Sequence, residues 1–93
     1  MENKEPYEFK AARLRYLIHR RGWRLNSGIS ELAALFEDAQ VSDYAKASCY
    51  VSMLEYAGVH NDPMARLACL RVSENAQKSL NTVQEILLTT QPA

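Results

Sequence analysis

The residues whose types and spacing could do chemistry are concentrated in one arginine-rich segment, 10–24. Guanidinium groups beside an exposed indole suit phosphate backbones and stacked bases, and they suit an acidic protein surface equally well. A third interpretation leaves the arginines as a solvated helix face and places the indole in the core. The segment contains no acidic residue, and its charged and indole side chains are Lys10, Arg13, Arg15, Arg20, Arg21, Arg24 and Trp23.

Within this segment, we select as candidate partner-binding residues Arg13, Arg20, Arg21, Trp23 and Arg24. The formal net charge of the whole chain is zero, with 11 basic and 11 acidic side chains. Nucleic-acid-binding domains are usually basic overall, and Gly22 stands before an irregular connection that gives no helix-turn-helix register. We therefore expect a protein partner, and a nucleic acid is the alternative ligand of the same segment.

No set of residues has the spacing of a metal or catalytic site. Cys49, Cys69, His60 and Asp62 lie in the second half of the chain, but neither a CxxC nor an HxxxH pattern occurs. No nucleophile elbow is recognisable around Cys49 or a serine, and three scattered glycines cannot form a phosphate-binding loop. We expect no metal, no cofactor and no enzymatic activity.

Length and composition favour one small helical domain spanning residues 1–93. The apolar share is 47%, and only three Gly and three Pro argue against a β-sandwich with many turns. The two cysteines lie within apolar helical patterns, so we interpret them as buried thiols in a reducing compartment. No signal peptide or 18-residue apolar run is present, so we expect a soluble, cytoplasmic protein that does not enter a membrane.

The longest predicted element is a helix over 62–89. Asp62 can cap its first turn, and Pro63 loses no hydrogen bond at the first helical position. A helix of some 25 residues is about 38 Å long, so other elements or a second copy must lie along it. Seven apolar residues at steps of three and four form one stripe along this helix: Ala65, Cys69, Val72, Ala76, Leu80, Val83 and Leu87.

Two helices are predicted in the first half of the chain, after a frayed segment 1–5. Good helix formers favour a helix over 6–20, although Leu14, Tyr16 and Ile18 also alternate as in a strand. We expect Gly22 to end this element and 23–28 to be a connection. Ser30 then caps a helix over 30–40.

The third predicted helix, 43–57, has apolar side chains on two sides. Ser42 caps its start and Gly58 its end. One of its stripes contains Tyr44, Ala47, Val51 and Leu54, and the other contains Ala45, Cys49, Ser52 and Tyr56. Together with 62–89 it forms an antiparallel hairpin, so we predict an all-α protein, a small three- or four-helix bundle framed by that hairpin.

The second apolar side of the hairpin predicts association. A helix that is apolar on two sides is normally enclosed, and one short chain covers only one such side. We therefore expect a homodimer whose interface contains Cys49, Tyr56, Met64, Leu67 and Leu70. The function that fits best is a regulatory or adaptor protein acting by protein–protein binding, such as an antiactivator, a chaperone or a sequestering partner.

Overall fold

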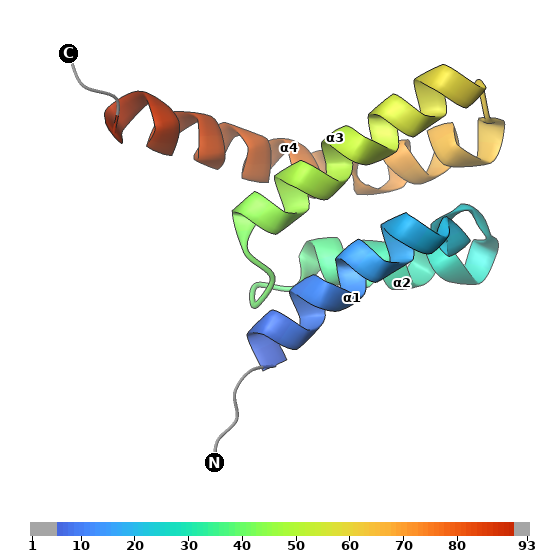
Figure 1. Cartoon of the computed structure of the whole chain (residues 1–93), viewed down its shortest axis with the longest axis horizontal. Helices are drawn as coiled ribbons and strands as arrows, with labels where there is room; N and C mark the ends of the chain where they lie inside the picture. Colours follow the sequence, from blue (N-terminus) through green and yellow to red (C-terminus); the bar gives the residue numbers. More distant parts are fainter. Residues whose placement is uncertain (1–5, 91–93) are drawn as a thin grey trace.

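The chain folds into helices throughout the described range. The structure, a computed structural model, describes residues 6–90, with residues 6–8 and 90 placed by their backbone alone. The frayed segment predicted at 1–5 lies outside this range. The elements are α1 (Pro6–Arg20), the short 3-10 helix η1 (Gly22–Arg24), α2 (Asn26–Glu37), α3 (Asp43–His60) and α4 (Pro63–Thr90) (Figure 1).

Helix α1 has the predicted bounds, but the segment after it differs from the prediction. Residues 22–24 form η1, and α2 begins at Asn26, four residues earlier than expected. Ser30 is therefore inside α2 and does not cap it. The extended residue Leu25 precedes the helix, and no side chain makes a capping hydrogen bond there. Helix α2 starts without a sequence signal because its first turn is held by packing against η1.

That packing depends on the absence of a side chain at Gly28. A Cβ atom at this position would lie 2.0 Å from the backbone oxygen of Gly22 and 2.8 Å from the Cα atom of Trp23. Two backbone segments therefore approach each other more closely than any residue with a Cβ atom allows. The close contact is what turns the chain from η1 directly into α2.

Helix α3 begins as predicted and ends later. The Ser42 hydroxyl accepts a hydrogen bond from the Ala45 backbone N–H at 3.1 Å, which confirms the predicted cap. The helix continues through Gly58, which is not a C-cap, and ends at His60. Asn61 takes the left-handed conformation after it, with φ 51°, a geometry that asparagine tolerates better than most residues.

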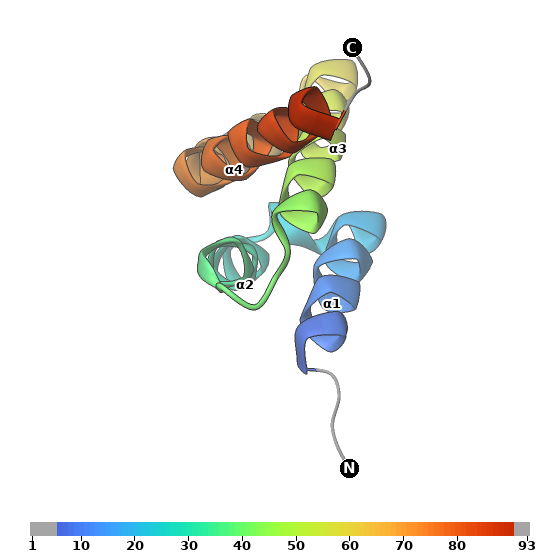
Figure 2. The same cartoon turned by 90° about the vertical axis from the view of Figure 1, so that its left-hand side faces the viewer.

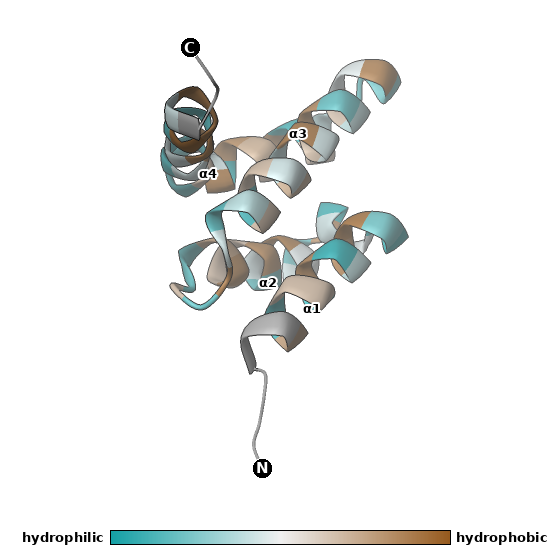
Figure 3. Cartoon of the chain, turned by 60° about the vertical axis from the view of Figure 1, so that its left-hand side comes forward, coloured by the Kyte–Doolittle hydropathy of each residue, from teal (hydrophilic) through white to brown (hydrophobic). Residues whose placement is uncertain are grey.

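Helix α4 starts at the predicted cap and reaches beyond its partner. The Asp62 carboxylate accepts from the backbone N–H groups of Met64 and Ala65, at 3.0 and 3.4 Å. Its 28 residues correspond to about 42 Å, so its C-terminal part extends past the start of α3 (Figure 1). The predicted stripe is buried from Ala65 to Ala76 and is exposed at Leu87. Figure 3 shows apolar residues at this C-terminal end of α4.

The four α-helices form two layers, the α3–α4 hairpin over the α1–α2 pair (Figures 1 and 2). Small residues of α4 allow α3 to approach closely, because their side chains leave room for the neighbouring backbone. The largest fully buried side chains come from both layers and from η1: Leu14, Trp23, Leu32, Phe36, Met53 and Val72.

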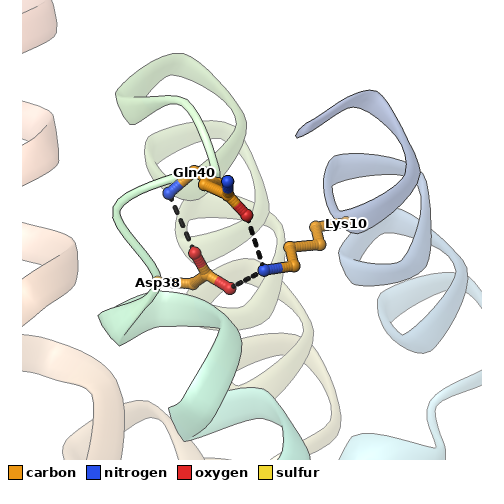
Figure 4. A network of polar contacts seen from close by, with 3 residues as sticks. All are labelled: Lys10, Asp38 and Gln40. Carbon is orange, nitrogen blue, oxygen red and sulfur yellow. Dashed lines mark hydrogen bonds and ion pairs between the residues drawn. The ribbon is translucent and has the colours of Figure 1, made fainter. Parts of the chain in front are cut away.

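A polar network joins α1 to the loop after α2 (Figure 4). Lys10 Nζ donates to Asp38 Oδ2 and to Gln40 Oε1, both at 2.7 Å, and the Gln40 backbone N–H donates to Asp38 Oδ1 at 2.9 Å. The hydrogen bond from Lys10 is the main reason that the pKa of Asp38 lies below its usual value of 3.8. Lys10 is thereby engaged within the chain.

Candidate protein-binding surfaces

One exposed stripe of α1 alternates aromatic and arginine side chains. Phe9, Arg13, Tyr16 and Arg20 are spaced by four, three and four residues, which places them on one face of a helix. Phe9 is 66% exposed and Tyr16 is 56% exposed. Two large aromatic rings exposed on one helix face indicate an interaction surface more strongly than a single exposed leucine does.

The stripe borders a pocket of about 550 Å³ between α1 and α2. We name it the arginine–aromatic groove. Its lining combines apolar side chains with three charged ones, Arg13 and Arg20 from α1 and Glu31 from α2. The complete lining is Phe9, Ala12, Arg13, Tyr16, Leu17, Arg20 and Glu31.

The two arginines of the groove differ in their partners. Arg13 Nε lies 2.9 Å from Glu31 Oε2, an ion pair that links α1 to α2. Arg20 Nη1 donates to the Tyr16 hydroxyl at 3.2 Å, and its guanidinium carbon lies 5.3 Å from the Tyr16 ring centroid. No carboxylate of the described residues forms an ion pair with Arg20. Its guanidinium is held in place and keeps donors for an external carboxylate.

The remaining arginines of the predicted set lie elsewhere. Arg21 and Arg24 stack near the ring of Tyr56, at 5.0 and 5.7 Å from its centroid. Arg24 Nη1 also donates to Asp62 Oδ2 at 2.6 Å. The basic segment therefore divides between two surfaces: Arg13 and Arg20 face the groove, and Arg21 and Arg24 face the end of the hairpin.

Trp23 is a core residue and does not line the arginine–aromatic groove. It is 1% exposed, its Nε1 donates to the Ile18 carbonyl at 3.3 Å, and its edge meets the Tyr56 ring at 5.8 Å. The prediction that it binds a partner is corrected, and the alternative with the indole in the core is the one that holds. A large apolar side chain just before a short helix buries more surface in the core than it would in a solvated turn.

Asp62 connects the arginine segment to the start of α4. Burial by itself raises the pKa of this carboxyl group. The hydrogen bonds from Arg24 and from the backbone N–H groups of Ala65 and Met64 outweigh that effect, so the pKa of Asp62 is below its usual 3.8. The carboxylate stays charged because these donors stabilise its ionised form.

The predicted dimer interface is brought together only in part. Met64, Leu67 and Leu70 are exposed along α4, and Leu70 is 72% exposed. Cys49 is 5% exposed and belongs to the core, and Tyr56 is half-buried under Arg21 and Trp23. Cys49 is therefore corrected, because the side of α3 that it shares with Met53 and Ala57 faces inward.

The apolar side chains of α3 that do face outward include Leu54. It lines a groove of about 320 Å³ with Leu70 of α4. Sequence reasoning assigned the other stripe because both stripes have similar hydrophobicity. We name the exposed set of Leu54, Met64, Leu67 and Leu70 the hairpin face.

Neither thiol is positioned for chemistry. Cys49 and Cys69 are buried and form no disulfide, which confirms the prediction of buried thiols. Burial raises the pKa of Cys49 to about 11, so its thiol stays protonated at neutral pH. Among the described residues, no group of three His, Cys, Asp or Glu side chains could hold a metal ion.

Phe9 and Tyr16 are functional candidates that the sequence reasoning did not select. A usable signal was present in the spacing, because Phe9 and Tyr16 interleave with Arg13 and Arg20 on one helical face.

Comparison with profiles of known protein families, with curated proteins and with solved structures finds no match to this chain. Within residues 6–90, none of the helices has the length and apolar character needed to cross a bilayer.

Proposed function

We propose that this protein is a regulatory or adaptor module that binds an acidic amphipathic helix of another protein in the arginine–aromatic groove. The observation that carries the proposal is the exposed alternation of Phe9 and Tyr16 with Arg13 and Arg20 along that groove. The stripe spans about 16 Å, or three helical turns. A helix lying in a groove uses apolar anchors at this scale, and flanking carboxylates would meet the guanidinium groups.

The groove suits a protein helix better than a nucleic acid. Its lining is mostly apolar, with Phe9, Ala12, Tyr16 and Leu17 among its residues, which suits the apolar face of a helix. Nucleic-acid affinity comes mainly from many phosphate contacts. Of the two arginines that line this groove, Arg13 is already paired with Glu31, so Arg20 is the one left to contact a phosphate. Binding of this kind would allow the protein to sequester or present its partner without catalysis.

A synthetic amphipathic peptide tests the proposal. The probe is a fluorescein-labelled helix with leucines on one face and glutamates beside them, and anisotropy reports its binding to the full chain. Replacing both Arg13 and Arg20 by glutamine is expected to weaken binding about tenfold or more, because two charge-assisted contacts are lost. Tyr16→Ala removes an exposed anchor and is expected to weaken binding without unfolding the protein.

Arg71→Gln is the matched control, because Arg71 is exposed on α4 away from the groove. It changes the net charge by one unit and should leave peptide binding nearly unchanged. A labelled DNA duplex is the rival ligand. Tighter retention of the duplex than of the peptide at equal salt, or equal loss with Arg71→Gln and the groove variants, would contradict the proposal.

We propose in addition that two copies of the chain associate through the hairpin face. Met64, Leu67 and Leu70 follow at steps of three along α4. If two α4 helices pair antiparallel about a two-fold axis at Leu67, Leu70 of one copy meets Met64 of the other. Such an isologous contact is self-complementary in its side chains, and Leu54 borders it across the hairpin groove.

Analytical ultracentrifugation tests the association. At tens of micromolar we expect a dimer, and Leu70→Glu is expected to give a monomer, because the charged group would be buried without a partner. Val59→Glu introduces the same charge at an exposed apolar residue outside the hairpin face and should leave the dimer intact. A wild-type monomer at this concentration would remove the proposal.

A further inference from the structure

A second pocket is lined by residues from the end of α1, from η1 and from the second half of α3. Its volume is about 330 Å³, and it shares no lining residue with the arginine–aromatic groove. Among the described residues no acidic side chain lines it. The lining residues are Ile18, His19, Arg21, Trp23, Ser52 and Tyr56. We propose that this corner pocket binds a phosphate group.

The principal ligand group is the Arg21 guanidinium. It stacks at 5.0 Å from the Tyr56 ring centroid, and Trp23 packs edge-on against the same ring. The described residues offer it no carboxylate at ion-pair distance. A planar guanidinium presents a rigid fork of N–H donors that matches two oxygens of a phosphate. The hydroxyl of Ser52 lines the same pocket and can donate a further hydrogen bond.

The local charge balance favours an anion. Two guanidinium groups, of Arg21 and Arg24, gather around Tyr56, and the His60 ring lies 4.2 Å from it. The one carboxylate bound to this cluster in the described residues is that of Asp62, which pairs with Arg24 at 2.6 Å. Within residues 9–89, no carboxylate serves as a counterion for Arg21. A bound dianion would supply that counterion.

The backbone at Arg21 supports a role for its side chain. Arg21 follows α1 in the left-handed conformation, with φ 62° and ψ 19°, and its N–H donates to the Leu17 carbonyl at 2.9 Å. Glycine is the residue favoured at such a helix end, yet here the left-handed residue is Arg21 and Gly22 follows it. A side chain retained in a strained conformation points to a function for that side chain.

The carbonyl group of α1 next to the pocket does not oppose an anion strongly. The Ile18 carbonyl accepts hydrogen bonds from the Arg21 backbone N–H, at 3.2 Å, and from Trp23 Nε1, at 3.3 Å. A carbonyl oxygen that already accepts two bonds repels a neighbouring oxygen less than a free one. This acceptor is therefore already satisfied, and Arg21 and Ser52 are lining residues whose side chains can donate to an anion.

Nuclear magnetic resonance on the full-length protein tests the proposal directly. The chain has one tryptophan, so the Trp23 indole N–H gives a single resolved signal at the pocket wall. Inorganic phosphate is expected to shift it saturably, and sodium chloride at equal ionic strength is not. Arg21→Gly is expected to raise the phosphate dissociation constant about tenfold or more. Its thermal midpoint should stay equal or rise, because glycine relieves the left-handed backbone.

Arg20→Gln is the matched control. It removes the same charge one residue earlier, from a side chain that lines the other groove, and should keep phosphate binding. Should Arg21→Gly lose its helical circular dichroism, Arg21→Gln and Ser52→Ala carry the test, since they preserve the backbone conformation of the wild type. A shift that does not saturate, or one that survives in the Arg21 variants, overturns the proposal.

Phosphoserine distinguishes the two sources of the phosphate group. Tighter binding of phosphoserine than of inorganic phosphate identifies a phosphorylated side chain as the ligand. The reverse order identifies a free phosphate. In both cases the Arg21 variants must lose the binding that Arg20→Gln retains.

Discussion

Replacing Gly28 by alanine is expected to lower the free energy of unfolding by about 3 kcal/mol, the upper end of the usual cost of overpacking. The added Cβ atom would lie 2.0 Å from the Gly22 oxygen, and the other nearest atoms are also backbone. No flexible side chain can move away to make room, so η1 and α2 must separate. Urea unfolding followed by far-UV circular dichroism measures the change.

Gly58→Ala is the control for this prediction and should have the opposite sign. Gly58 is inside α3, and an added Cβ atom there would meet nothing within 4 Å. Alanine in a helix interior is more stable than glycine by about 0.5–1 kcal/mol. If both substitutions shift the urea midpoint in the same direction, the close approach of Gly28 to Gly22 is not present in solution.

Trp23→Ala is expected to cost about 3–5 kcal/mol, as other buried Trp and Phe truncations do. Trp23 is 1% exposed, and it joins α1 through Ile18 and α3 through Tyr56. The loss is a large part of the roughly 5–15 kcal/mol that stabilises an ordinary domain. Thermal unfolding should show a strongly reduced midpoint or no cooperative transition.

Trp23→Phe retains an aromatic ring in the same cavity and should cost less than half as much, which separates loss of packing from loss of the indole hydrogen bond. A Trp23→Ala protein within about 1 kcal/mol of the wild type would mean that the indole is at the surface. In that case Trp23 would again be a candidate partner-binding residue.

The amino-acid sequence determined the local elements because their causes are local. The caps at Ser42 and Asp62 depend on a side chain and the backbone of the next three residues, so they can be predicted from the sequence alone. The same holds for α1, where good helix formers outweighed the alternating pattern of a strand. The α4 stripe was also visible, because its period of 3.6 residues continues over several turns.

The bounds of α2 and α3 and the faces that meet were decided by the tertiary structure. Gly28 lies in the first turn of α2 because its backbone packs on Gly22, and no side-chain cap marks the start of that helix. Cys49 is inside and Leu54 outside because α4 and α1 cover the side of α3 that carries Cys49, Met53 and Ala57. The arginines divide between the groove at Arg20 and the corner pocket at Arg21 because α1 ends between them. Periodicity states which residues share a face, but only contacts between distant segments decide which face is covered.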